Sequence, residues 1–239
     1  MTFQPVLPSV PELWEGFLHL IYPELCVACS ADLPASGGCF CFSCQLKCDH
    51  TDMYMVRENE FTDRFWGRLE VESGAALYYF SRKSPVQRAL HELKYGNNPE
   101  IGIRIGRELG AKLRSSGNFD SVELIVPVPL HAKKERLRGY NQSAMFAKGL
   151  AESMQLPVSD KALARLVHSE SQTRKKRMER FQNVGEVFVV KNKAALEGRH
   201  VLLVDDVLTT GATLEVCGQA IRAVPGTRLS LATIAIAMN

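Results

Sequence analysis

Short, almost wholly apolar runs alternate with segments of helical periodicity along most of this chain. Three such runs are typical of strands buried on both faces of a parallel sheet, at residues 75–80, 124–129 and 201–204. Apolar residues recur at three- and four-residue intervals elsewhere, which predicts helices at 84–93, 100–114 and 141–154 and after residue 213. Strands that alternate with helices predict an α/β fold with a mostly parallel sheet flanked by helices.

The run at 201–204 leads directly into Asp205 and Asp206, which we expect at the carboxyl end of a strand. Open α/β sheets bind ligands at that edge. A hydroxyl- and glycine-rich loop follows, made of Thr209, Thr210, Gly211, Ala212 and Thr213. The next helix points its positive N-terminus at the same place. This turn therefore offers carboxylates for hydroxyl groups beside a cradle for phosphate, a pairing that fits a sugar phosphate.

The stretch 201–213 resembles the 5-phosphoribosyl-1-pyrophosphate (PRPP) motif of type I phosphoribosyltransferases. The resemblance implies that the two acidic residues contact the ribose hydroxyls and that the loop amides hold the 5′-phosphate. Two alternatives remain, an ordinary strand end in a solvated turn and a Walker-B-like strand end. The second needs a G-x-x-x-x-G-K-[ST] loop, and the chain contains no such string.

A second anion site is predicted after the 124–129 strand. The basic loop expected at 131–140 carries Lys133, Lys134, Arg136 and Arg138, and Asn141 is a candidate N-cap for the next helix. If the two strands are parallel, this loop lies at the same sheet edge as the acidic pair. The polar, basic middle of segment 163–188, which includes Arg177, has the composition of a mobile lid. A solvated basic face explains either cluster equally well.

Six of the seven cysteines lie between residues 26 and 48. Two C-x-x-C pairs supply four thiolates for a compact tetrahedral zinc site, from Cys26, Cys29, Cys41 and Cys44. Zinc binding contributes on the order of 10–16 kcal/mol to a segment too short to form its own core. Cys39 or Cys48 could replace one of these ligands, and a redox role for the pairs is less favoured.

Four further segments extend the resemblance over nearly the whole chain: H-E-L-K-Y (91–95), V-P-V-P-L (126–130), R-G-Y-N-Q (138–142) and the series Gln172, Arg177, Asn183, Phe188. With the 201–213 stretch they are similar to the ComF family, which includes competence protein F and GntX-type proteins. That resemblance implies a zinc-ribbon-like module in front of a type I phosphoribosyltransferase-like domain. We therefore predict a helix and zinc module in residues 1–50, a linker that docks on the core in 51–73, and the phosphoribosyltransferase-like domain in 74–239.

The resemblance also implies an activity, the transfer of a phosphoribosyl group from PRPP to an unknown acceptor with Mg²⁺ present. Asp205 and Asp206 would hold the ribose and, through water, the Mg²⁺, while residues 209–213 would anchor the 5′-phosphate. The pyrophosphate would lie on Arg138, Gly139, Tyr140 and Asn141. Arg177 would close over it as part of the lid.

A different class of function is a non-catalytic partner in DNA uptake that contacts single-stranded DNA or a helicase-type protein. The aromatic residues Phe61, Phe65 and Trp66 lie near charges, as base stacking requires, but core packing explains them more simply. The net charge of +3 is too small to indicate nucleic-acid binding by itself. No membrane span or signal peptide is predicted, since the apolar stretch 13–22 carries Glu15, so the cytoplasm is the expected compartment.

Overall fold

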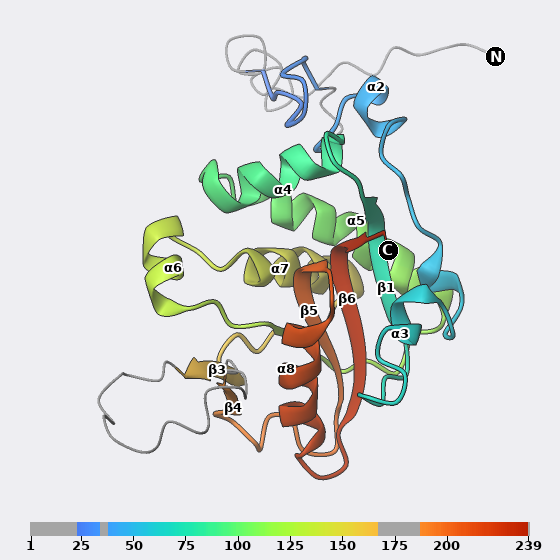
Figure 1. Cartoon of the computed structure of the whole chain (residues 1–239), viewed down its shortest axis with the longest axis vertical. Coiled ribbons are helices and arrows are strands. Elements are labelled where there is room, and N and C mark those ends of the chain that lie inside the picture. Colours follow the sequence, from blue (N-terminus) through green and yellow to red (C-terminus); the bar gives the residue numbers. More distant parts are fainter. Residues whose placement is uncertain (1–22, 34–37, 167–186, 239) are drawn as a thin grey trace, which may run out of the picture.

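The computed structural model describes residues 23–33, 38–166 and 187–238. Its centre is a sheet of four strands in the order β1-β6-β5-β2 (Figure 1). The strands are β1 (Gly74–Phe80), β2 (Leu124–Pro127), β5 (His200–Leu208) and β6 (Arg228–Ala237). All three pairings are parallel, which confirms the predicted α/β class. A separate antiparallel pair joins β3 (Leu163–Leu166) to β4 (Val187–Val190).

Helices cover both faces of this sheet. They are α4 (Pro85–Tyr95), α5 (Glu100–Ser116), α6 (Ala132–Arg138), α7 (Gln142–Met154) and α8 (Ala212–Arg222). Helices α5 and α7 lie side by side on one face, and α8 covers the other (Figure 1). The buried face of α8 carries Leu214, Cys217 and Ile221, so the seventh cysteine is a core residue.

Glycines set the close approach of α5 to α7. Gly102, Gly106 and Gly110 recur every four residues along the buried side of α5. They face α7, where Gly106 lies close to Gly149 and a Cβ added at Gly149 would collide with the carbonyl oxygen of Ile103. This contact fixes the N-terminus of α7, which is the end that reaches the acidic pair.

The local start signals of α4 and α7 are confirmed. Ser84 caps α4 by accepting a hydrogen bond from the Gln87 amide, and Asn141 caps α7 through the Ser143 amide. The prediction of a basic loop at 131–140 is wrong in one respect: most of this segment forms the helix α6. The His131 ring caps that helix, and Gly139 ends it with φ +80°.

Among the described residues of the N-terminal third, three short helices are present: α2 (Phe42–Gln45), η1 (Met53–Met55) and α3 (Glu60–Asp63). The backbone at 49–51 runs antiparallel to β1, since the Thr51 amide donates to Leu77 and the Tyr79 amide donates to Asp49. Phe61 and Phe65 are fully buried, whereas Trp66 is 86% exposed. Core packing therefore accounts for two of the three aromatic residues.

The boundaries proposed at residues 50 and 73 stay predictions. The helix expected near residues 9–21 lies outside the described residues. No helix within the described ranges is long and apolar enough to cross a membrane.

Candidate functional site

Asp205 and Asp206 lie within strand β5 rather than beyond its end. The strand continues to Leu208, and Asp205 is in register with Thr233 of β6. The strand and its buried run thus extend further than the sequence predicts, and Asp206 is only 8% exposed. The strand accommodates the two carboxylates because polar groups of α4 and α7 contact their oxygens.

Each carboxylate has its own partners. Asp206 Oδ2 lies 2.8 Å from the Lys94 ammonium and accepts a 3.2 Å hydrogen bond from the Gln142 side chain. Asp205 Oδ1 accepts 2.8 Å and 2.9 Å bonds from the Ser143 hydroxyl and the Asp206 amide. The C-terminal turn of α4 and the first turn of α7 thus meet at the acidic pair.

Burial raises the pKa of the Asp205 carboxyl to about 7, and the adjacent charge of Asp206 adds to this effect. The hydrogen bond from Ser143 and the charge of Lys94 act in the opposite direction without cancelling it. A bound cation or a set of hydroxyl donors would favour the ionised form of this carboxyl.

The phosphate-type loop predicted at 209–213 joins β5 to α8. Gly211 has φ +82°, and a Cβ there would lie 3.0 Å from the Phe65 ring, so both conformation and space require glycine. Helix α8 starts at Ala212 without a side-chain cap. Its first backbone N–H groups and its dipole therefore favour an anion at this loop.

Arg64 contacts the backbone of the 209–213 loop. Its guanidinium donates a 2.7 Å bond to the carbonyl of Thr209 and also bonds the carbonyl of Ala237 at the end of β6. The Arg64 side chain is 9% exposed and forms an ion pair with Glu60. Because the guanidinium holds a carbonyl of the loop, it fixes the loop's backbone orientation.

The predicted pyrophosphate segment lies beside the acidic pair. Arg138 donates a 2.9 Å bond to Gln142, which in turn contacts Asp206. The Arg138 guanidinium also lies 5.3 Å from the centre of the Tyr95 ring. The Tyr140 hydroxyl donates a 2.6 Å bond to the Leu93 carbonyl and so ties this segment to α4.

A cavity of about 580 Å³ opens between α4 and α6. Its lining consists of Lys94, Tyr95, Asn97, Lys134, Arg136, Leu137, Arg138 and Gly139. Four of these side chains are cationic, and none of the described residues that line it carries a carboxylate. The cavity therefore favours an anion. Arg177, the proposed lid residue, lies outside the described residues.

The four predicted zinc ligands come together. The Sγ atoms of Cys26, Cys29, Cys41 and Cys44 all lie within 4.8 Å of one another. Zinc–thiolate bonds of about 2.3 Å in a tetrahedron need sulfur atoms slightly less than 4 Å apart, so this cluster fits zinc. Burial raises the pKa of Cys26, but backbone hydrogen bonds outweigh it and lower the pKa to about 6, which favours the thiolate that a metal needs.

The two extra cysteines point elsewhere. The Cys39 thiol lies 3.8 Å from the Ile101 carbonyl oxygen, and the Cys48 thiol lies 3.3 Å from the carbonyl of Cys44. Burial raises the pKa of both thiols to about 12. Among the described residues, neither Sγ atom belongs to the cluster formed by the other four cysteines.

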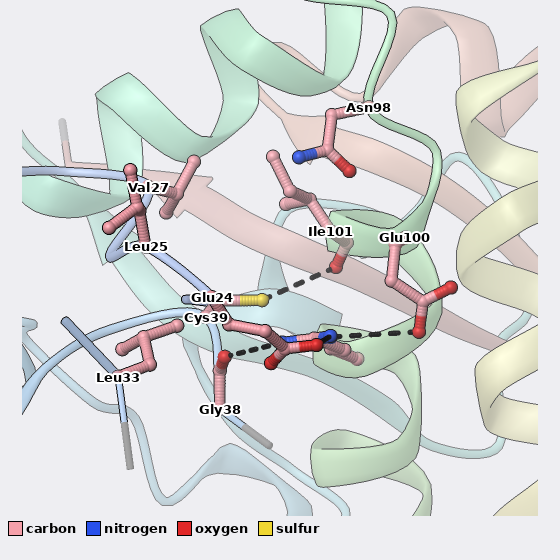
Figure 2. A pocket seen from close by; sticks show the side chains of 10 residues that line it. Glu24, Leu25, Val27, Leu33, Gly38, Cys39, Asn98, Glu100 and Ile101 are labelled. Atoms are coloured by element: carbon pink, nitrogen blue, oxygen red, sulfur yellow. Dashed lines mark hydrogen bonds and ion pairs between the residues drawn. The ribbon is translucent and has the colours of Figure 1, made fainter. Parts of the chain in front are cut away.

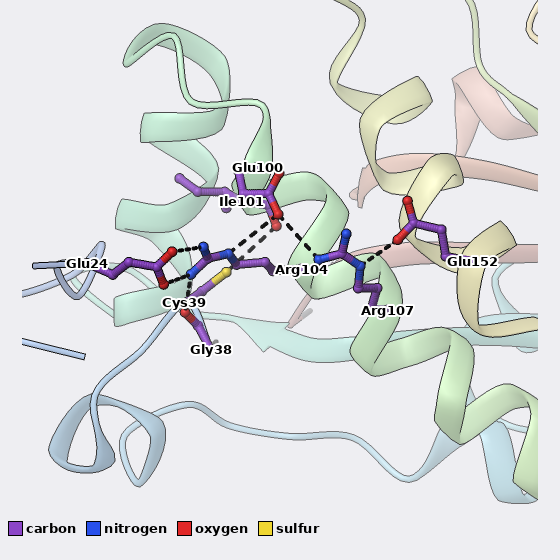
Figure 3. Close-up of polar contacts among 8 residues, drawn as sticks. All are labelled: Glu24, Gly38, Cys39, Glu100, Ile101, Arg104, Arg107 and Glu152. Atoms are coloured by element: carbon purple, nitrogen blue, oxygen red, sulfur yellow. Dashed lines mark hydrogen bonds and ion pairs between the residues drawn. The ribbon is translucent and has the colours of Figure 1, made fainter. Parts of the chain in front are cut away.

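Arg104 of α5 contacts the cysteine module. Arg104 forms a two-pronged ion pair with Glu24 at 2.5 and 2.7 Å and donates to the Gly38 carbonyl at 3.0 Å (Figure 3). A cavity of about 220 Å³ lies beside this pair, between the module and the start of α5 (Figure 2). Its walls combine apolar side chains with the paired charges of Glu24, Glu100 and Arg104.

Known proteins resemble this chain over most of its length. A model of the phosphoribosyl transferase domain matches residues 141–238. Competence protein ComFC of Bacillus subtilis is 39% identical over 205 residues, which cover 82% of this chain and 78% of that protein. This chain belongs to the ComF family.

Other known proteins are also similar to this chain. Competence protein F of Haemophilus influenzae is 26% identical over 213 residues, 87% of this ComF-family chain and 88% of that protein. The DNA utilization protein YhgH of Escherichia coli is 28% identical over 133 residues, 54% of this chain and 58% of that protein. A solved glutamine PRPP amidotransferase of B. subtilis, complexed with ADP and GMP, superimposes with a TM-score of 0.41 at 18% identity, over 60% of this chain and 30% of that one.

The sequence predicted the acidic pair, the loop and the basic segment as parts of one site, and that assignment stays a prediction; it did not single out the residues that contact the acidic pair and the loop. Lys94 and Gln142 lie inside the H-E-L-K-Y and R-G-Y-N-Q segments, so those segments carried a usable signal. Ser143 and Arg64 have no such signal, because their roles arise only from contacts across the fold.

Proposed function

We propose that this ComF-family protein binds PRPP together with Mg²⁺ and transfers the phosphoribosyl group to an acceptor through a nitrogen nucleophile. One observation carries the proposal: Asp205 and Asp206 lie between an anion-binding loop and a basic segment. The loop follows β5, and the basic segment follows the neighbouring parallel strand β2. A ligand with a phosphate, vicinal hydroxyls and a second phosphoryl group suits this arrangement.

Each part has a proposed role in the transfer. The loop 209–213 and the N-terminus of α8 would hold the 5′-phosphate, and Asp205 and Asp206 would accept hydrogen bonds from the ribose hydroxyls. Carboxylate oxygens also suit Mg²⁺, which would neutralise charge on the pyrophosphate. Arg138, Gly139, Tyr140 and Asn141 would contact that pyrophosphate, and Arg177 would close over it.

The reaction breaks the bond between ribose C1 and a pyrophosphate oxygen and forms a bond from C1 to the acceptor nitrogen. The electron pair of the broken bond leaves with the pyrophosphate, so negative charge grows there in the transition state. The protein's task is to position the two reactants and to stabilise that charge.

The test is calorimetry with PRPP and Mg²⁺, followed by a pyrophosphate-release assay over a panel of bases and amines. Asp206→Asn and Asp205→Asn should weaken PRPP binding, because an amide accepts hydroxyl protons less strongly and binds Mg²⁺ poorly. The exposed Asp120→Asn is the matched control. Unchanged PRPP affinity in both site variants would refute the assignment of the site.

The second candidate is a non-catalytic partner in DNA uptake, and the names of the competence and DNA-utilization relatives favour it. Arg138→Ala and Arg177→Ala separate the two candidates. An enzyme should lose roughly 3–4 kcal/mol of transition-state stabilisation, or about two to three decades of turnover. A DNA-binding partner should instead bind single-stranded DNA less tightly, with a salt slope reduced by about one per lost contact.

We also propose a structural zinc ion on Cys26, Cys29, Cys41 and Cys44. The cluster supplies the four sulfur ligands typical of a closed site. Such a site leaves no open coordination position for catalysis.

A further inference from the structure

Lys94 occupies a position between two parts of the site. Its Nζ lies 2.8 Å from Asp206 Oδ2, and the same side chain lines the cationic cavity with Arg136 and Arg138. Among the described residues that line this cavity, Lys94 is the one whose ion pair reaches the acidic pair. The side chain is 27% exposed, so it borders solvent on the cavity side.

The contact with Asp206 competes with ribose binding. Lys94 and Gln142 both contact the same oxygen, Oδ2. A ribose hydroxyl or a Mg²⁺-bound water that donates to this carboxylate must share or displace these contacts. Gln142 is held by Arg138, whereas a lysine ammonium sits on a flexible four-carbon stem. Lys94 is therefore the partner that can move.

The backbone at Lys94 is held in place, whereas its ammonium lies at the end of a flexible stem. The neighbouring carbonyl of Leu93 accepts the 2.6 Å hydrogen bond from Tyr140, which ties the end of α4 to the segment after α6. Tyr95, next in sequence, lies under the Arg138 guanidinium. The ammonium can thus turn from Asp206 to the cavity without movement of α4.

We propose that Lys94 is an exchangeable counter-ion, which pairs with Asp206 and transfers to the pyrophosphate of PRPP when ribose and Mg²⁺ engage the carboxylates. In the transfer step it keeps its proton and donates hydrogen bonds to the departing pyrophosphate, where negative charge accumulates. This inference rests on the proposed function and adds a leaving-group contact from α4, outside the segments already assigned to the ligand.

Lys94→Met tests the exchange, because methionine keeps the length of the stem and removes the charge. Calorimetry with Mg²⁺ and pyrophosphate should show affinity reduced about tenfold or more, the loss expected for a charged hydrogen bond. Ribose 5-phosphate should bind as tightly as before or more tightly, because its competitor for Asp206 is gone. Lys94→Arg should restore part of the pyrophosphate affinity, and Lys148→Met on the exposed side of α7 is the matched control.

The opposite responses of the two ligands distinguish exchange from a structural role. Equal weakening of both ligands, or unchanged pyrophosphate binding, would overturn the proposal. If Lys94→Met does not fold, Lys94→Gln keeps a hydrogen-bond donor for Asp206 and is measured in the same way. A wild-type protein that binds neither PRPP nor pyrophosphate would refute the proposed function itself, and this inference with it.

Discussion

Replacing Asp205 by asparagine should stabilise the fold while it damages the site. The carboxyl of Asp205 has its pKa raised from 3.8 to about 7, first by burial and then by the adjacent Asp206. In the unfolded chain both causes vanish, so the folded state binds the proton more tightly than the unfolded state. By linkage, this group lowers stability as pH rises through the interval from about 4 to 7.

The size of the effect follows from that interval. One pH unit with a full proton difference is worth about 1.36 kcal/mol, so wild-type stability should fall by roughly 2–3 kcal/mol between pH 5 and pH 8 through Asp205. Asparagine does not titrate, and its oxygen can still accept from the Ser143 hydroxyl and the Asp206 amide. The advantage of the variant should therefore grow by about that amount over the same range.

Urea unfolding at pH 5, 6, 7 and 8 measures this difference, with zinc and ionic strength held constant. The exposed Asp120→Asn is the control and should show no such trend. The melting temperature of Asp205→Asn relative to wild type should rise by roughly 2–4 °C per kcal/mol. An advantage equal at pH 5 and pH 8 would refute the argument, and so would one that shrinks with pH.

Three further predictions test other parts of the structure. Purified protein should hold about one zinc per chain by elemental analysis, and Cys41→Ser should lose it whereas Cys39→Ser should keep it; the reverse result would show that the ligand set is wrong. Gly149→Ala should cost about 1–3 kcal/mol or more in urea unfolding, because its Cβ meets the Ile103 carbonyl, and a cost near zero would show that α5 and α7 can separate freely. Arg64→Met should weaken phosphate or PRPP binding by calorimetry and Arg64→Lys should restore part of it, whereas equal affinities would exclude a role in positioning the loop.

The sequence predicted most of the sheet and the order of the elements, since its strands are continuous apolar runs. It misjudged the end of β5 because adjacent carboxylates are depleted in strands. Val207 and Leu208 continue the strand past them, which is possible only because Lys94, Gln142 and Ser143 satisfy the buried oxygens. No pattern within β5 itself indicates those partners, which lie far away in the chain.

The basic segment shows a second limit of local reasoning. Gly139 and the lysines and arginines around it indicated an anion-binding loop, and glycine does end a structural element there. The residues before it form α6, a short helix that presents its basic side chains to the cavity shared with α4. Charge composition therefore predicted a basic site, which the basic lining of the cavity is consistent with, but it did not predict the local structure.

The segment 51–73 has a closer connection to the site than a linker would have. Arg64 and Phe65 contact the 209–213 loop from behind, the first through the Thr209 carbonyl and the second through van der Waals contact at Gly211. A linker sequence can vary without effect on a distant loop, whereas a change at either residue alters the backbone that would face a phosphate. Because the preceding residues 49–51 pair with β1, the cysteine module is joined to this support by an ordered backbone. Arg64 and Phe65 are therefore part of the structure that shapes the 209–213 loop, although neither residue belongs to the PRPP-like motif.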